Sequence, residues 1–337
     1  MKMMKHKNIA LFVPHLGCPH QCSFCNQKSI SGETKQISSD DVKTACETAL
    51  KSGNCEQAEI AFFGGSFTAI DRDYMVSLLS SAYEYVRSGK FRGVRISTRP
   101  DCINEEILHI LKSYGVTAIE LGCQSMDDGV LRLNQRGHSV KDIETASALI
   151  KRFGFELGHQ MMTGLYGSDE EKDILTAEKL IELKPDTVRI YPTVVLENTG
   201  LAEKYKNKEY IPQNTEDAIK LCAKLLLMFE SADIPVIRLG LHSGGNVEEG
   251  YIAGAFHPAF REKCESEIYY EKFVEGLEAV PPGEIEITVS SRFVSQAIGH
   301  GKENIKKLSS LGYETKIMQN PDFAKYEFEI IPKGKNK

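Results

Sequence analysis

The sequence predicts an α/β protein, with a partial (β/α)6 barrel followed by a small α/β domain at the carboxyl end. Strand-like apolar runs alternate with helix-like segments almost to residue 243, which is the pattern of parallel βαβ units. Unusual glycine, cysteine and polar motifs come directly after the expected strands, where a βα barrel carries its binding groups. The 337 residues allow one such barrel and a smaller domain, which we expect over 1–245 and 246–337.

Six strands and the helices between them are expected in the first domain. The strands are predicted over residues 8–15, 59–63, 93–97, 118–122, 155–162 and 187–191. Helices are predicted over residues 40–51, 104–113, 140–153 and 214–231, and another one ends near residue 87. The last and longest helix carries apolar residues at helical spacing, and Cys222 is one of them. We therefore assign Cys222 to the core rather than to a metal.

Composition and charge favour a protein of the reducing cytoplasm. Hydrophobic residues make up 41% and charged residues 26% of the chain, as in ordinary globular proteins. No apolar run reaches the ~20 residues that span a bilayer, and no signal peptide is visible, so we expect no membrane association. The net charge of −6 argues against broad attachment to nucleic acid. Residues 298–337, however, carry eight lysines against five acidic residues.

Three cysteines lie close together near the start of the chain. Cys18, Cys22 and Cys25 have the spacing Cys-x3-Cys-x2-Cys on one short loop after the first expected strand. In a reducing compartment such a group is a set of metal ligands rather than disulfide partners. Three thiolates can hold three corners of a cubane iron–sulfur cluster and leave the fourth iron open. A structural zinc site needs a fourth ligand, which His15 or His20 could supply.

The cysteine loop, with Phe24 just before its last cysteine, resembles the signature of the radical S-adenosylmethionine (SAM) superfamily. The resemblance implies a partial barrel of the radical SAM type, a [4Fe-4S] cluster held by Cys18, Cys22 and Cys25, and SAM chelating the open iron through its amino and carboxylate groups. A reduced cluster would then split SAM into methionine and a 5′-deoxyadenosyl radical. The resemblance places Phe24 near the adenine of SAM, and the alternative is that its ring only shields the iron.

Further SAM-binding positions follow from resemblance to the superfamily and to oxygen-independent coproporphyrinogen oxidases. The Gly64-Gly65-Ser66 segment is similar to the glycine motif that receives the SAM amino group. Gln124 and Arg136 fall on SAM-contacting positions, Ser97 falls where those oxidases often have a glutamate, and Gln160 is a further candidate. A plain tight turn is the alternative for the two glycines, and ordinary polar loop residues are the alternative for the four polar positions. His138 and His159 are expected either to transfer protons near the site or to be ordinary hydrogen-bonded histidines.

Several motifs resemble those of the Elongator catalytic-subunit family, which modifies the wobble uridine of tRNA with a carboxymethyl group from acetyl-CoA. They occupy residues 97–101, 120–125, 136–138, 189–193 and 198–201, within a likeness that covers roughly residues 8–240. That family has a longer gap between its first two cluster cysteines and an acetyltransferase domain after the barrel. Residues beyond the barrel here show no acetyl-CoA-binding pattern, so the SAM chemistry is carried over and the acetyl-CoA donor is not.

The carboxyl-terminal segment is similar to the core of a KH domain. A strand is predicted over 284–289, helices over 292–298 and 302–310, and two strands over 313–319 and 326–331 that pair with each other. In a KH domain the loop between the helices clamps a nucleic-acid backbone. The RNA-binding candidates are therefore Gly299, Gly301, Lys302, Lys306 and Lys307, with Lys302 where the second glycine of the usual loop would stand. The alternative is a small α/β cap over the barrel mouth.

The leading hypothesis is a cytoplasmic radical SAM enzyme that modifies tRNA and draws electrons from a flavodoxin or ferredoxin. One alternative is a radical SAM enzyme that acts on a small molecule, as the coproporphyrinogen oxidases do. Another is an RNA-binding protein that uses its iron–sulfur cluster only structurally. Salt-sensitive RNA binding separates the first hypothesis from the second, because neutralised phosphates release counterions.

Overall fold

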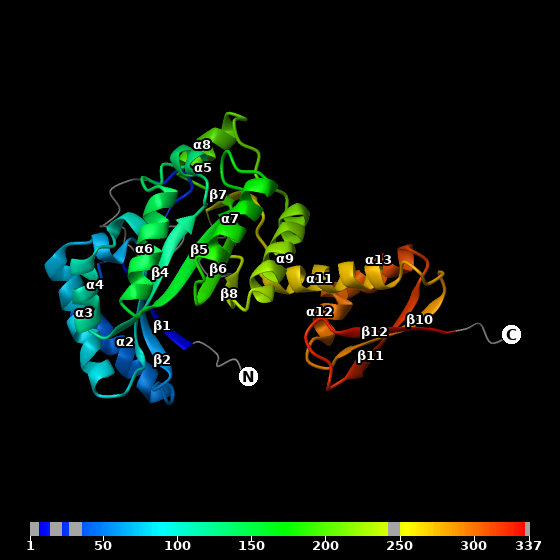
Figure 1. Cartoon of the computed structure of the whole chain (residues 1–337), viewed down its shortest axis with the longest axis horizontal. Coiled ribbons are helices and arrows are strands. Elements are labelled where there is room, and N and C mark those ends of the chain that lie inside the picture. The colour runs from blue at the N-terminus through cyan, green and yellow to red at the C-terminus, as the bar shows by residue number, and fades with distance from the viewer. Residues whose placement is uncertain (1–6, 14–21, 27–35, 242–249, 334–337) are drawn as a thin grey trace.

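The computed structural model describes residues 7–13, 22–26, 36–241 and 250–333. A large sheet surrounded by helices forms one unit, and a smaller unit lies beside it (Figure 1). One long helix runs from the first unit into the second.

Seven parallel strands build the large sheet and lie side by side in their order along the chain. They are β1 (Lys7–Val13), β2 (Ala58–Gly64), β3 (Gly93–Thr98), β4 (Val116–Gln124), β5 (Glu156–Thr163), β6 (Thr187–Pro192) and β8 (Val236–Leu239). Helical crossovers between parallel neighbours produce the partial barrel that the sequence predicts. The six expected strands are all present, and the short strand β8 extends the sheet by one.

Helices lie on the outer face of this sheet and at its rim. They are α2 (Ser39–Ser52), α3 (Arg72–Arg87), α4 (Glu105–Ser113), α5 (Asp128–Leu133), α6 (Val140–Arg152), α7 (Glu170–Glu182), α8 (Gly200–Lys206) and α9 (Thr215–Ser231), with short 3-10 turns at Phe67–Ala69 and Pro100–Cys102. Side-chain caps fix where they begin. Ser38 and Asp41 form a capping box at α2, and Asn104 and Asn214 accept backbone N–H groups at α4 and α9.

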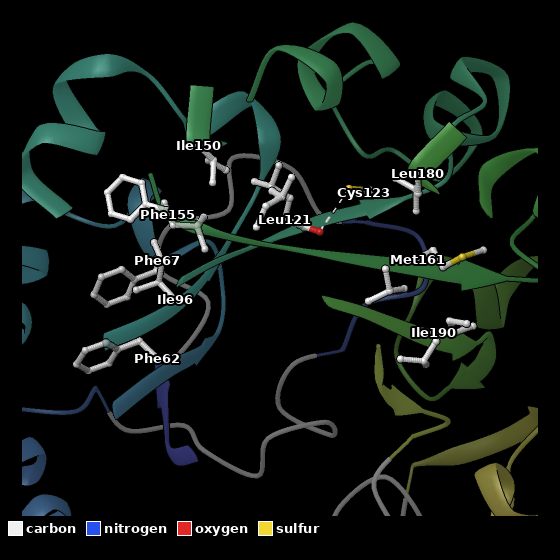
Figure 2. Packing of buried hydrophobic residues seen from close by; sticks show 14 of the residues in the cluster. Phe62, Phe67, Ile96, Leu121, Cys123, Ile150, Phe155, Met161, Leu180 and Ile190 are labelled. Atoms are coloured by element: carbon white, nitrogen blue, oxygen red, sulfur yellow. Dashed lines mark hydrogen bonds between the residues drawn. The ribbon is translucent and has the colours of Figure 1, made fainter. Parts of the chain in front are cut away.

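The outer face of the sheet is apolar. Alternate strand residues point toward the helices and are buried there, among them Phe62, Ile96, Leu121 and Ile190 (Figure 2). Period-two alternation gives each strand one such face. Cys222 on α9 is fully buried in the same core, which confirms its structural assignment.

The inner face of the sheet carries a buried ionic network. Arg95 is fully buried, and its guanidinium bonds Glu59 (2.7 Å), Glu120 (3.3 Å) and Glu156. Arg189 donates two hydrogen bonds to the same Glu120 carboxylate, at 2.6 and 2.9 Å. Buried charges are tolerated only when they are paired and hydrogen-bonded, and this network meets both conditions.

A glycine makes room for this network. Glu120 on β4 pairs in register with Gly158 on β5, and Gly158 pairs with Thr187 on β6. A Cβ atom at residue 158 would lie 2.8 Å from Cγ of Glu120. Because Gly158 has no side chain, the Glu120 carboxylate reaches across β5 to Arg189.

A second, antiparallel pair of strands follows β6. It consists of β7 (Val194–Leu196) and β9 (Tyr251–Gly254). Val195 of β7 and Leu201, at the start of α8, belong to a small buried apolar cluster, and Phe24 packs against this cluster. The sequence pattern does not predict this pair, since each strand is only three or four residues long.

The carboxyl-terminal unit is a three-stranded sheet with helices. Its elements are β10 (Glu284–Ser290), α12 (Val294–Ile298), the 3-10 turn η3 (His300–Lys302), α13 (Glu303–Ser310), β11 (Glu314–Asn320) and β12 (Phe328–Pro332). Strand β10 is central, parallel to β11 and antiparallel to β12. The predicted pairing of the last two strands with each other is therefore wrong. The two helices return the chain parallel to β10, which leaves the other edge of β10 for β12.

Helix α11 (Phe260–Gly276) belongs to two cores. Phe260, Cys264 and Ile268 are buried in the barrel core, where α11 packs against α9. Tyr269 and Phe273 are buried in the core of the carboxyl-terminal unit. That unit attaches to the outer helical layer rather than to the strand ends, so the structure does not support a cap over the barrel mouth. None of the helices in the described ranges is long and apolar enough to cross a membrane.

Candidate cluster and cofactor site

Two of the three predicted cluster ligands lie in the described part of the cysteine loop. Cys22 is 4% exposed and Cys25 is partly exposed. The Cys25 N–H donates to the Cys22 carbonyl at 3.1 Å, so the two residues share one tight turn. Cys18, His15 and His20 lie outside the described residues. The loop stands after the carboxyl end of β1, as the sequence predicts.

Ser23 anchors the loop to the barrel rim. Its N–H and hydroxyl donate to the backbone carbonyl (3.2 Å) and Oδ1 (2.9 Å) of Asn134, just after α5. Its carbonyl accepts from the Leu201 N–H at 2.6 Å, at the start of α8. Asn26 donates from its side chain to the Glu197 carbonyl. Sequence reasoning assigns no role to Asn134, although it stands two residues before Arg136, and recognises the segment around Leu201 only as a family motif.

Arg136 joins the cysteine loop to β4. Its Nη1 donates to Cys22 Sγ at 3.1 Å, and its Nη2 donates to the Gly122 carbonyl at 2.7 Å. The guanidinium carbon lies 5.9 Å from the centre of the Phe24 ring. A charged donor therefore stands directly against the sulfur of a predicted cluster ligand. The predicted contact of Arg136 with SAM stays a prediction.

Glycine is required at the end of β2, beside the loop. Gly64 ends β2 with φ of 112°, and a Cβ atom there would lie 2.5 Å from the Val13 carbonyl oxygen. Gly65 donates its N–H to that same carbonyl at 3.1 Å. A side chain would thus separate β1 from β2 just below the cysteine loop. The structure explains the glycine at 64 through this close approach, and the SAM contacts of Gly64, Gly65 and Ser66 stay predictions.

Gln124 holds an unusual backbone conformation at the end of β4. It has φ of 68° and is 4% exposed, and its side-chain oxygen accepts from Gln160 Nε2 at 3.4 Å. A Cβ atom at Gly122 would lie 3.1 Å from Gln124 Nε2 and 3.3 Å from Arg136 Nη2. Three predicted site residues therefore meet around Gly122. Ser97 pairs in register with Glu120 on the same sheet.

The two candidate histidines have different surroundings. His138 is buried beside the site, with Nε2 3.3 Å from the Cys123 carbonyl, and burial together with the nearby Arg136 charge lowers its pKa to about 4. His159 lies on the outer face of β5, where Nε2 is 2.9 Å from Ser147 Oγ on α6. Burial lowers the His159 pKa to about 3. Of the two alternatives for His159, the structure supports an ordinary hydrogen-bonded core histidine and not a group that transfers protons at the site.

The predicted RNA-binding residues lie together in the carboxyl-terminal unit. Gly299, Gly301 and Lys302 have φ of 84°, 59° and 63° in the turn between α12 and α13. Lys302 and Lys306 are exposed. Lys307 instead bonds Glu267 of α11 at 2.8 Å and lies over the Tyr270 ring. Its charge is already paired, so Lys302 and Lys306 are the candidates that remain open to a phosphate.

The family models decide the class of this site. The model described as "Radical SAM superfamily" matches residues 12–180, and the "Radical_SAM C-terminal domain" matches residues 185–270. The chain belongs to the radical SAM superfamily. Members of this superfamily use a [4Fe-4S] cluster and SAM, and the cysteine loop at the end of β1 lies within the matched range.

The relatives found by sequence are Elongator-like. A "tRNA uridine(34) acetyltransferase" of Methanocaldococcus jannaschii is 30% identical over 245 residues, covering 60% of this chain and 45% of that protein. "Elongator complex protein 3" of Homo sapiens is 32% identical over 193 residues, covering 51% and 35%. The chain spans about half the length of the first of these relatives.

A solved structure shares the fold. The archaeal Elp3 of Methanocaldococcus infernus matches with a TM-score of 0.64 and 21% identity, covering 84% of this chain and 70% of that one. The likeness extends beyond the barrel, since 84% of the chain is more than the barrel alone contains.

The described residues fit an anionic, thiolate-bound group. Among them, two buried guanidinium atoms at the loop have no hydrogen-bond partner: Nε of Arg136 and Nη1 of Arg99. Arg99 is oriented by two hydrogen bonds to Asp101, at 2.9 and 2.7 Å. Two thiols in one turn with two buried cations nearby are a suitable donor set for an iron–sulfur cluster and the carboxylate of SAM.

Proposed function

We propose that this protein is a radical SAM enzyme that modifies tRNA, with a uridine as the nucleoside attacked. Two observations support this proposal. In the structure Arg136 contacts both Cys22 and Phe24, and among the sequence relatives are proteins named for tRNA uridine(34). The two findings concern different steps. The first supports cofactor binding, and the second supports the substrate.

In this proposal the cluster and SAM supply an organic radical, and the chain positions them. Cys22 and Cys25, with Cys18, hold the cluster. Arg136 donates a hydrogen bond to the Cys22 sulfur and would orient this ligand. Gly64 and Gly65, with Ser66, Ser97, Gln124, Gln160 and Arg136, receive SAM over the carboxyl ends of β2 to β5, with Phe24 against the adenine. The apolar outer layer and the paired charges of the inner face keep the barrel rigid around the reacting groups.

The carboxyl-terminal unit is the proposed RNA anchor. Its turn at Gly299–Lys302 has positive φ at Gly299, Gly301 and Lys302, and two exposed lysines, Lys302 and Lys306, stand at its end and on the following helix. Such a turn can clamp a phosphodiester backbone. Electrons would come from a flavodoxin or ferredoxin in the cytoplasm.

The test is 5′-deoxyadenosine formation by anaerobically reconstituted protein with SAM and reductant, with and without bulk tRNA. We expect tRNA to stimulate the reaction and digested tRNA to contain a uridine of altered mass. Cys22→Ala should abolish both the cluster and SAM cleavage. Cleavage that ignores tRNA, with unchanged nucleosides, would contradict the tRNA assignment and favour a small-molecule substrate.

A further inference from the structure

An arginine on the last strand of the barrel points to a further binding site. Strand β8 is the edge of the sheet, and Arg238 pairs in register with Arg189 of β6. The next pair, Ile190 and Leu239, is buried in the outer core. A register shift separates Val236 from Arg238 on β8. Beyond the shift, Arg238 is paired with Arg189 and directly precedes the buried Leu239, so it shares the inner face with Arg189.

Arg238 differs from the other inner-face arginines in its charge balance. Arg95 is surrounded by three carboxylates, and Arg189 is held by both oxygens of Glu120 and lies over the Phe63 ring. Within the described ranges, Arg238 makes one hydrogen bond, from Nε to the Gly240 carbonyl at 3.2 Å, and no ion pair. It is partly exposed. Among the described residues, no carboxylate pairs with its guanidinium, which lies on the face turned to the barrel interior.

This charge lies away from the cluster end of the site. Arg136 bonds Cys22 and β4, and Arg238 is three strands further along the sheet. Neighbouring strands are about 4.8 Å apart, so the two strands are about 14 Å apart along the sheet. In the proposed function the carboxylate of SAM would be bound beside the cysteine loop, where Arg136 and Arg99 lie, and not at β8.

The proposed RNA anchor lies next to the same edge. Phe260, at the start of α11, packs against Gly240 directly after β8, and Arg261 donates to the Val236 carbonyl within β8. His257, just before α11, meets His300 of the η3 turn edge-on, with ring centroids 5.7 Å apart. An RNA strand bound at the η3 turn would therefore pass beside the edge of the sheet that carries Arg238.

We propose that Arg238 binds a phosphate group of the substrate inside the barrel. The inference rests on the proposed function, which makes the substrate a nucleotide within RNA. A guanidinium whose Nη groups are open can take two phosphate oxygens at once. The contact fixes the nucleotide at the β8 side and leaves its base directed across the lumen toward the cofactor.

Chemical footprinting of the wild-type protein tests the proposal. The reconstituted full chain is treated with phenylglyoxal, and arginine adducts are mapped by peptide mass spectrometry. We expect uridine 5′-monophosphate to protect Arg238 at millimolar concentration and uridine to leave it reactive. Arg87, exposed on α3, is the internal control and should react equally in all samples. Equal reactivity of Arg238 with both compounds, or full protection by SAM alone, would overturn the proposal.

Substitution of Arg238 tests the same proposal through the affinity for uridine 5′-monophosphate. Arg238→Gln should weaken binding of uridine 5′-monophosphate about tenfold or more by equilibrium dialysis, Arg238→Lys should weaken it less, and Arg87→Gln should not change it. Unchanged affinity in Arg238→Gln would contradict the inference. A failure of the proposed function looks different: tRNA nucleosides then stay unmodified by the wild type, while the protection of Arg238 by the nucleotide persists.

Discussion

At the scale of single residues, Arg136 links the predicted cluster ligand to the barrel. One guanidinium bonds the Cys22 sulfur and a β4 carbonyl and covers the Phe24 ring. The contact joins residues 114 positions apart in the sequence. Its effect should therefore be electrostatic as well as structural, since a charged donor stands directly against a ligand atom.

We expect Arg136→Gln to lower the reduction potential of the bound cluster. Hydrogen bonds and positive charge near cluster sulfurs favour the more negative, reduced state. A redox titration followed by electron paramagnetic resonance measures the potential. Arg132→Gln, at an exposed position of α5, is the matched control. One potential shared by the wild type and both variants would show that the Cys22 contact has no influence on the cluster.

A single methyl group at residue 158 should destabilise the barrel. Gly158→Ala places a Cβ atom 2.8 Å from Cγ of Glu120, so the Glu120–Arg189 pair must shift. We expect a loss of about 1–3 kcal/mol in the free energy of unfolding, as for other overpacked interiors. Urea unfolding measures it. An unchanged midpoint would mean that the network moves without cost.

His159 should make the protein less stable in mild acid. Its pKa falls from 6.5 in the unfolded chain to about 3 in the fold, because burial disfavours the charged ring. The unfolded chain thus binds more protons between these values, and stability falls as the pH drops below 6.5. At pH 5 this one group accounts for about 2 kcal/mol. Urea unfolding at pH 5 and 7 should show a smaller difference for His159→Gln than for the wild type.

At the scale of elements, the sequence predicts what local patterns determine. All six expected strands and the long amphipathic helix are present, because each has its own apolar period and its own cap or turn. Strand β8 escapes prediction because it is four residues long and contains Arg238. The pairing of β12 with β10 escapes it because partners are chosen in the folded sheet, not within a segment.

In the candidate site, too, some residues can be recognised from the sequence and others only from the fold. The cysteine spacing and the polar residues after β4 are visible in the sequence, since their chemical types are unusual there. The anchors Asn134 and Leu201 are ordinary residues whose role depends on meeting Ser23 in space. Lys307 resembled its exposed neighbours until the fold placed Glu267 beside it.

Lysine substitutions in the η3 turn and in α13 can distinguish a loss of RNA binding from a loss of stability. We expect the double change Lys302→Glu and Lys306→Glu to weaken tRNA binding about tenfold or more and to flatten its salt dependence, without lowering the melting temperature. Lys307→Glu should instead cost about 1 kcal/mol of stability, because it faces Glu267. Filter binding at several salt concentrations and thermal melts check both. Normal tRNA affinity in the double variant would rule out this turn as the anchor.

At the scale of the whole molecule, α11 makes the two units one structure. Its first half is buried with the barrel, and its second half is buried with the three-stranded sheet. Lys325 adds bonds from the carboxyl-terminal unit to Glu230 on α9 and Glu265 on α11, at 2.7 and 3.2 Å. Separating the units would expose apolar surface on both sides of the helix, so we expect them to unfold together.

This shared helix also has a kinetic meaning for any ligand that touches both units. Once such a ligand is bound at one contact, the second contact is at a high effective concentration, because the shared helix replaces a flexible linker between the two units. Two weak contacts can then together give slow dissociation, whereas a ligand held by either contact alone would dissociate quickly. If the ligand is an RNA, as we propose, only an RNA that reaches both contacts would be retained.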